Sequence, residues 1–200
     1  MTEFEGSIHK KIEESMRCPL CSLVDGEEFN MLSRLQYDVS HDPAVREAIA
    51  REGGFCEFHF RQFRKIANAK TNALLLIALV ERYSQRDNHL TVHCRLCAHL
   101  DDYEGHLIEA VISLLKESPF RADYENHTGL CLDHLSAVRP LIADEELQRW
   151  LDELSRIQMQ RETASLEQMA TKSYYDTSRL ARGSVARIVE KFVGRRALSL

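Results

Sequence analysis

The chain carries the sequence Cys18-Pro19-Leu20-Cys21, which returns in nearly the same form as Cys94-Arg95-Leu96-Cys97. A second motif, Gly54-Phe55-Cys56-Glu57-Phe58-His59, returns as Gly129-Leu130-Cys131-Leu132-Asp133-His134. The displacement between copies is one residue longer for the first motif than for the second. This nearly constant displacement predicts an internal repeat, in which one structural unit occurs twice.

Other residues recur together with the cysteine motifs. Asp42-Pro43 corresponds to Ser118-Pro119, and each pair predicts a helix N-cap followed by proline at the first helical position. Glu28 and Glu104 each follow the second cysteine of their motif by seven residues, a helical spacing that predicts a carboxylate facing inward. We expect these carboxylates to form ion pairs, with Arg64 and Arg139 as partners, because two helical turns separate them from the cysteines. The alternative is a carboxylate near the metal or in a ligand pocket.

The composition favours an all-α protein. Only 8 Gly and 4 Pro occur in 200 residues, too few for a fold rich in tight turns, and strand-like alternation is absent. We predict duplicated helical-hairpin units, each clamped by a Cys3His metal site, followed by a long helix over about 144–172 and an amphipathic tail. The expected domains are 1–86, which includes a buried apolar spine helix at 71–85, then 87–171, and the tail at 172–200.

Cysteine and histidine side chains are the usual ligands of structural zinc, and four of them close a tetrahedral site. Each copy supplies C-x2-C and C-x2-H, and these motifs use all 6 cysteines. We therefore predict two zinc ions per chain, each bound within one copy. The first site is expected to comprise Cys18, Cys21, Cys56 and His59, and the second Cys94, Cys97, Cys131 and His134.

Three other interpretations of these motifs stay open. Thiolate ligands with one histidine also bind iron-sulfur clusters, and a C-x2-C pair also serves as a redox dithiol. The remaining alternative is buried cysteine without metal. His93, His99 and His106 lie near the second C-x2-C, but the first copy has no counterpart of them, so we interpret them as exposed or hydrogen-bonding residues rather than ligands.

No catalytic residue is predicted, because the sequence lacks the common metalloprotease, serine hydrolase, phosphate-loop and dinucleotide-binding motifs. A net charge of −5 argues against general binding to nucleic acid. Residues 1–16 lack the apolar stretch of a signal peptide, and the longest apolar run, 73–80, is too short to cross a membrane. A cytoplasmic protein is expected.

The C-terminal third predicts contact with other molecules. Leu147, Trp150, Leu151, Leu154 and Ile157 form one apolar stripe, which thins after Ile157. Residues 172–200 carry seven basic and two acidic residues, and the apolar face 185–193 lies opposite a basic face with Arg187, Lys191 and Arg195. We expect a protein partner or self-association through 144–200. The tail is expected to dock on the acidic body of its own or a sister chain, and an anionic membrane surface is a further candidate.

The paired CPLC and GFCxxH elements resemble a prokaryotic family of unknown function that is defined by these repeated motifs. The resemblance covers about residues 8–142, and Arg95 in place of Pro19 leaves the ligands intact. It implies an intracellular helical protein and no particular activity. From the residues themselves, we expect a binding or adaptor module with two structural zinc sites, and the alternative is a redox protein, either a thiol and zinc switch or an iron-sulfur electron carrier.

Overall fold

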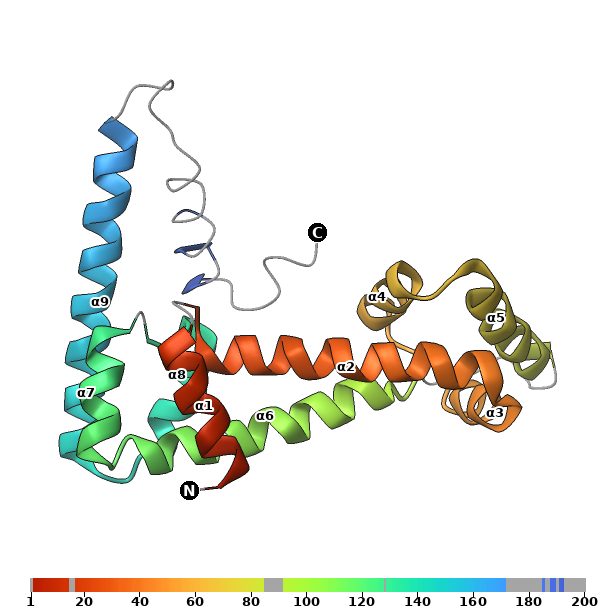
Figure 1. The fold of residues 1–200 in the computed structure, drawn as a ribbon, viewed down its shortest axis with the longest axis horizontal. Helices are drawn as coiled ribbons and strands as arrows, with labels where there is room; N and C mark the ends of the chain where they lie inside the picture. Colours follow the sequence, from red (N-terminus) through yellow and green to blue (C-terminus); the bar gives the residue numbers. More distant parts are fainter. Residues whose placement is uncertain are drawn as a thin grey trace. The chain divides into compact units, whose positions relative to one another are not determined.

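The structure is a computed structural model, which describes residues 2–14, 17–84, 92–127, 129–171 and the single positions 185, 188, 189, 191 and 192. Within these ranges the chain is helical and contains no β-strand, which confirms the predicted all-α class (Figure 1). The elements are α1 (Glu3–Glu14), α2 (Pro19–His41), α3 (Pro43–Arg51), α4 (Glu57–Ile66), α5 (Ala69–Ser84), α6 (Arg95–Leu114), α7 (Ser118–Asn126), α8 (Leu132–Val138), the 3-10 helix η1 (Arg139–Leu141) and α9 (Glu145–Thr171). No helix in the described ranges is long and apolar enough to cross a membrane.

The chain forms two compact units whose boundaries differ from the predicted 1–86 and 87–171. Unit 1 combines Met1–Asp25 with Glu104–Leu200, and unit 2 consists of Gly26–Tyr103. The difference arises because α2 and α6 are long helices that each begin in one unit and end in the other. Unit 1 is therefore discontinuous in sequence, and unit 2 is inserted into it.

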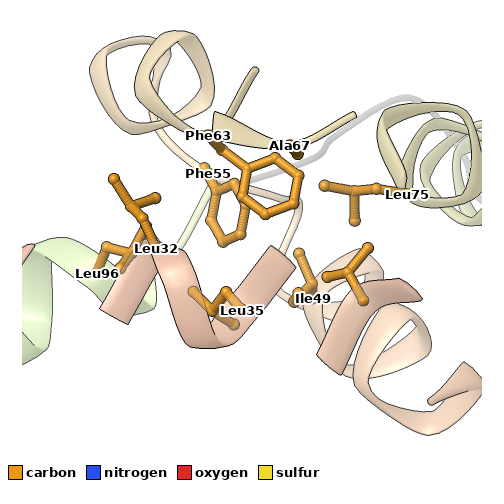
Figure 2. Close-up of a cluster of buried hydrophobic side chains, with 9 residues drawn as sticks. Leu32, Leu35, Ile49, Phe55, Phe63, Ala67, Leu75 and Leu96 are labelled. Carbon is orange, nitrogen blue, oxygen red and sulfur yellow. The ribbon is translucent and has the colours of Figure 1, made fainter. Parts of the chain in front are cut away.

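The core of unit 2 brings together apolar residues from all its helices. Figure 2 shows Phe55 and Phe63 at its centre, and their ring centroids are 5.4 Å apart. The cluster comprises Leu32, Leu35, Val39, Ile49, Phe55, Phe63, Ala67, Leu75 and Leu96. Leu32, Leu35 and Val39 recur at helical spacing on α2, so one face of this helix is buried here.

Helix α5 differs from the predicted buried spine. Thr71 and Leu75 are its buried residues, whereas Leu76, Ile77 and Val80 are exposed. The helix lies entirely in unit 2. The apolar run 73–80 thus has one face in the core and one face at the surface.

Unit 1 is built around α6, α7 and α9. Leu107, Val111 and Leu114 of α6 are buried, as are Phe120 and Tyr124 of α7. Helix α1 contacts α7 through the rings of His9 and Phe120, which are nearly perpendicular and have centroids 4.9 Å apart. Helix α9 contacts α7 through Trp150, which donates a hydrogen bond to Glu125 and lies under the guanidinium of Arg121.

The predicted long helix near the C-terminus is confirmed as α9. The Asp144 carboxylate accepts hydrogen bonds from the backbone N–H groups of Glu146 and Leu147 and so caps the helix. Leu147, Leu151 and Leu154 are buried as predicted. Burial continues at Gln158 and Glu162, beyond the point at which the stripe was expected to thin.

Most of the predicted tail, 172–200, lies outside the described residues. Among its described positions, Ile188 and Lys191 are buried, whereas Val185, Val189 and Phe192 are exposed. Lys191 was expected on the face opposite the apolar residues, but it is buried as Ile188 is, so burial does not follow the predicted division into an apolar and a basic face at these positions.

The two predicted N-caps have different outcomes. Asp42 caps α3 by accepting a hydrogen bond from the backbone N–H of Ala44, with Pro43 at the first helical position as expected. Helix α7, however, begins at Ser118 and has Glu117 at its N-cap. Pro119 then lies within the first turn, where its missing N–H needs no partner.

Candidate metal centres

The eight predicted cysteine and histidine ligands gather in two groups. The unit 1 site comprises Cys18, Cys21, Cys131 and His134, and the unit 2 site comprises Cys56, His59, Cys94 and Cys97. In each group, the four potential ligand atoms all lie within 4.8 Å of one another. Both groups have the predicted Cys3His composition.

The predicted pairing of the motifs is wrong. Each C-x2-C pair meets the C-x2-H pair of the other sequence copy, not the one that follows it in its own copy. The length of α2 explains this, because its 23 residues rise about 35 Å and the 9 residues of α3 recover only about 14 Å. Helices α6 and α7 impose the same limit on the second copy, since they contain 20 and 9 residues.

Each C-x2-C motif lies at the start of a long helix. Cys18 immediately precedes α2, and its carbonyl accepts the hydrogen bond of the Ser22 N–H. Cys94 immediately precedes α6, and its carbonyl accepts from the Ala98 N–H in the same way. The second cysteine of each motif follows one helical turn later, so the two thiols share one side of the helix start.

Each C-x2-H motif lies at the start of a short helix. Cys56 and Cys131 are the N-caps of α4 and α8. The histidine three residues later lies in the first turn, which leaves 3.2 Å between Cys56 Sγ and His59 Nδ1 and 3.0 Å between Cys131 Sγ and His134 Nδ1. The predicted proximity of these side chains within one helical turn is confirmed.

Glycine permits the sharp turns before these caps. Gly54 has φ of 91° and Gly129 has φ of 76°, a conformation that costs other residues free energy. The turn at Gly129 is held by hydrogen bonds, from its own N–H to His127 Nδ1 and from the Leu130 N–H to the Tyr124 hydroxyl. Gln158 of α9 donates a further hydrogen bond to the carbonyl of His127.

In both sites the histidine presents Nδ1 to all three sulfurs. His134 Nδ1 lies 3.0, 3.4 and 3.5 Å from the Sγ atoms of Cys131, Cys21 and Cys18. In unit 2, His59 Nδ1 lies 3.2, 3.3 and 3.4 Å from Cys56, Cys97 and Cys94. One point near the middle of each group is thus within reach of one nitrogen and three sulfurs.

The other ring nitrogen of each histidine approaches a glutamate. His134 Nε2 lies 3.1 Å from a carboxylate oxygen of Glu104, and His59 Nε2 lies 3.7 Å from one of Glu28. These carboxylates face inward as predicted. Of the two arginines expected as their partners, Arg139 has a different contact, and the pairing of Arg64 stays a prediction. Arg139 pairs with Asp152 of α9, at 2.7 Å. A carboxylate beside Nε2 favours the tautomer that leaves Nδ1 free to bind a metal ion.

One cysteine of each site has a lowered pKa. Burial opposes ionisation of Cys18, but hydrogen bonds with Cys131, Cys21 and His134 hold its pKa well below the usual thiol value. Burial likewise opposes ionisation of Cys94, yet the hydrogen bond with His59 lowers its pKa to about 6. Each site therefore stabilises a thiolate, the form of cysteine that binds metal ions.

The two sites differ in their exposure to solvent. Cys21, Cys131 and His134 are buried in unit 1, and Cys18 is half-buried. In unit 2 only His59 is buried, while all three cysteines are half-buried. Solvent thus reaches the thiols of unit 2 more readily.

The donor sets fit a metal ion. Three thiols and one imidazole are preferred ligands of zinc and of other thiophilic metals, and four of them complete a tetrahedral shell. Neither group is a disulfide, since all six cysteines are free. Arrangements of this kind bind metal without leaving a position for substrate.

The other candidate histidines stay outside both groups. His99 contacts Glu27 at 2.9 Å, and the His106 ring stacks on Phe4. The sequence did not predict that each glutamate contacts a ligand histidine, although a carboxylate near the metal was the alternative interpretation. Its signal was the equal spacing of Glu28 and Glu104 from their C-x2-C motifs.

Comparison with protein-family models, with curated proteins and with solved structures finds no match to this chain.

Proposed function

We propose that the chain is a zinc-binding protein, in which each Cys3His site holds one structural ion and the stabilised helices act as a binding or adaptor module. The observation that carries the proposal is the position of four donor atoms within 4.8 Å of one another in each unit. Tetrahedral zinc with sulfur and nitrogen ligands places its donors about 3.5–3.8 Å apart, close to the separations described above.

The proposed role of the ions is structural, because four protein ligands leave no open coordination position. In unit 1 the ion would join Cys21 at the start of α2 to Cys131 at the start of α8. In unit 2 it would join Cys56 at the start of α4 to Cys94 at the start of α6. These cysteines are far apart in the sequence and come together only in the folded chain. The free energy of binding the ion therefore adds to the free energy of folding.

Elemental analysis of the purified, reductant-handled chain tests the proposal. We expect about two zinc ions per chain, and we expect a chelator to lower the helical circular-dichroism signal as the ions leave. A native preparation that contains no metal and keeps its helicity would contradict the proposal.

A redox function is the second candidate, and one observation favours it. The half-buried thiols of Cys56, Cys94 and Cys97 are accessible enough for oxidation to displace an ion. Against an iron-sulfur cluster, sulfur pairs such as Cys56 and Cys97 are only 3.6 Å apart, which suits one ion better than a cluster. Visible absorption distinguishes the candidates, because a cluster colours the protein and zinc does not.

A further inference from the structure

Helix α5 presents an apolar face at the surface of unit 2. Leu76, Ile77, Val80 and Tyr83 follow one another within two turns and are 46–61% exposed. The buried residues of α5, among them Leu75, lie on the opposite side of the helix, so the exposed ones are not needed to hold it in the unit. Adjacent large apolar side chains in contact with solvent mark an interaction surface.

We propose that this α5 face joins two copies of the chain, with their α5 helices packed antiparallel about a two-fold axis. Charged residues that border the face support this occupant. Lys70 lies near the start of α5 and Glu81 near its end, and both are exposed. They are about three helical turns apart and therefore lie along the same flank of the apolar face. Leu76 and Tyr83 lie along the other flank.

The arrangement of charges selects the antiparallel orientation. When two identical helices pack antiparallel, equivalent flanks face each other, so Lys70 meets Glu81 of the partner subunit and Glu81 meets Lys70 of the partner subunit. In a parallel pair, opposite flanks would face each other and would place these charges against Leu76 and Tyr83. A two-fold contact requires a surface that is complementary to itself. The α5 face meets this requirement only in the antiparallel orientation.

The expected contact through 144–200 stays a prediction, and the α5 face is proposed beside it. Helix α9 exposes no large apolar side chain over its described length. The α5 face consists of only four large side chains. It is therefore small beside a standard interface, which buries about 800 Å² on each partner. We therefore expect a reversible dimer that dissociates at micromolar concentrations.

Sedimentation velocity of the full, zinc-loaded chain over a concentration series tests the proposal. We expect a monomer–dimer equilibrium, and we expect Ile77→Glu to weaken the dimer at least about tenfold, because a charge then lies at the centre of the contact. Tyr37→Glu is the control, since Tyr37 is an exposed aromatic residue on α2 of the same unit. It should leave the dimer unchanged, and both variants should keep the wild-type helicity and metal content.

Charge exchange tests the orientation. Lys70→Glu and Glu81→Lys should each weaken the dimer, and the double variant should restore it, because the exchanged charges again meet as opposites. A chain that stays monomeric throughout the series, or a dimer that Ile77→Glu does not affect, would overturn the proposal. Failure of the double variant to restore the dimer would overturn the antiparallel arrangement. The outcome is independent of the zinc proposal, which rests on metal content.

Discussion

At the scale of single residues, the glutamates behind the two ligand histidines give the sites a means of fixing the imidazole. Glu104 lies 3.1 Å from His134 Nε2, and we expect Glu104→Gln to weaken zinc binding in unit 1 by about 10-fold or more. Glutamine keeps the shape of the side chain and can still accept a hydrogen bond, but it removes the negative charge that strengthens Nδ1 as a ligand. Competition with a chromophoric chelator measures the change.

The longer contact in unit 2 provides a graded comparison. Glu28 lies 3.7 Å from His59 Nε2, so Glu28→Gln should have a smaller effect than Glu104→Gln. Glu27→Gln is the matched control, because Glu27 is the adjacent residue and contacts His99, which is not a ligand. Equal zinc affinity in wild type and Glu104→Gln would remove the role assigned to the carboxylate.

The glycines before the short helices lead to a second prediction at this scale. An alanine Cβ at position 129 would clash with the side-chain oxygen of Gln158, and the backbone there has a φ of 76°. We expect Gly129→Ala to destabilise unit 1 by at least about 1–2 kcal/mol, the cost of the left-handed backbone alone. Gly54→Ala should cost less, since its Cβ meets only the flexible end of Leu79 at 3.2 Å. Thermal unfolding of the zinc-loaded variants measures both, and an unchanged midpoint for Gly129→Ala would contradict the argument.

Single residues also show what the sequence can and cannot predict. All eight ligands and the inward direction of Glu28 and Glu104 follow from residue type and spacing. The partner of Arg139 does not, because Asp152 reaches it from α9, which is a later helix whose packing position has no local signal.

At the scale of elements, two glycines lie inside long helices at positions where no close contact excludes a larger residue. Gly26 in α2 and Gly105 in α6 are exposed, and an added Cβ would meet no atom within 4 Å at either position. We expect Gly26→Ala and Gly105→Ala each to stabilise the protein by about 0.5–1 kcal/mol, because alanine loses less backbone entropy in a helix.

Chemical denaturation of the two alanine variants, singly and combined, tests this expectation. The effects should add, since the glycines lie on different helices and lack a common partner. Gly129→Ala is the opposite control, because the same substitution there should destabilise. A loss of stability in Gly26→Ala would show that the glycine is needed in the folded chain.

Helix boundaries were predictable where a cap marked them. Asp42 caps α3 as expected, whereas α7 starts one residue earlier than the proline position indicated. The two sides of α5 were not predictable. A run of apolar residues such as 73–80 has no polar face, so its periodicity does not tell a buried helix from one with an exposed face.

At the scale of the whole molecule, the sequence identified the ligands but not their pairing. The 34 residues between Cys21 and Cys56 equal in number the 34 residues between His59 and Cys94. Spacing alone therefore does not distinguish a site that contains Cys56 and Cys94 from one that contains Cys21 and Cys56. Helix length decides between them, because the 23-residue α2 separates the first motif from the second.

The pairing leads to a prediction in which two double variants give different metal contents. Cys18 and Cys131 belong to one site, so Cys18→Ser combined with Cys131→Ser should keep about one zinc ion per chain. Cys18 and Cys56 belong to different sites, so Cys18→Ser combined with Cys56→Ser should lose both ions. Both variants remove two thiols, so the difference between them reports pairing and not thiol number. If the variant lacking Cys18 and Cys56 kept one ion and the other kept none, each ion would be bound within one sequence copy, and the interleaved arrangement would be wrong.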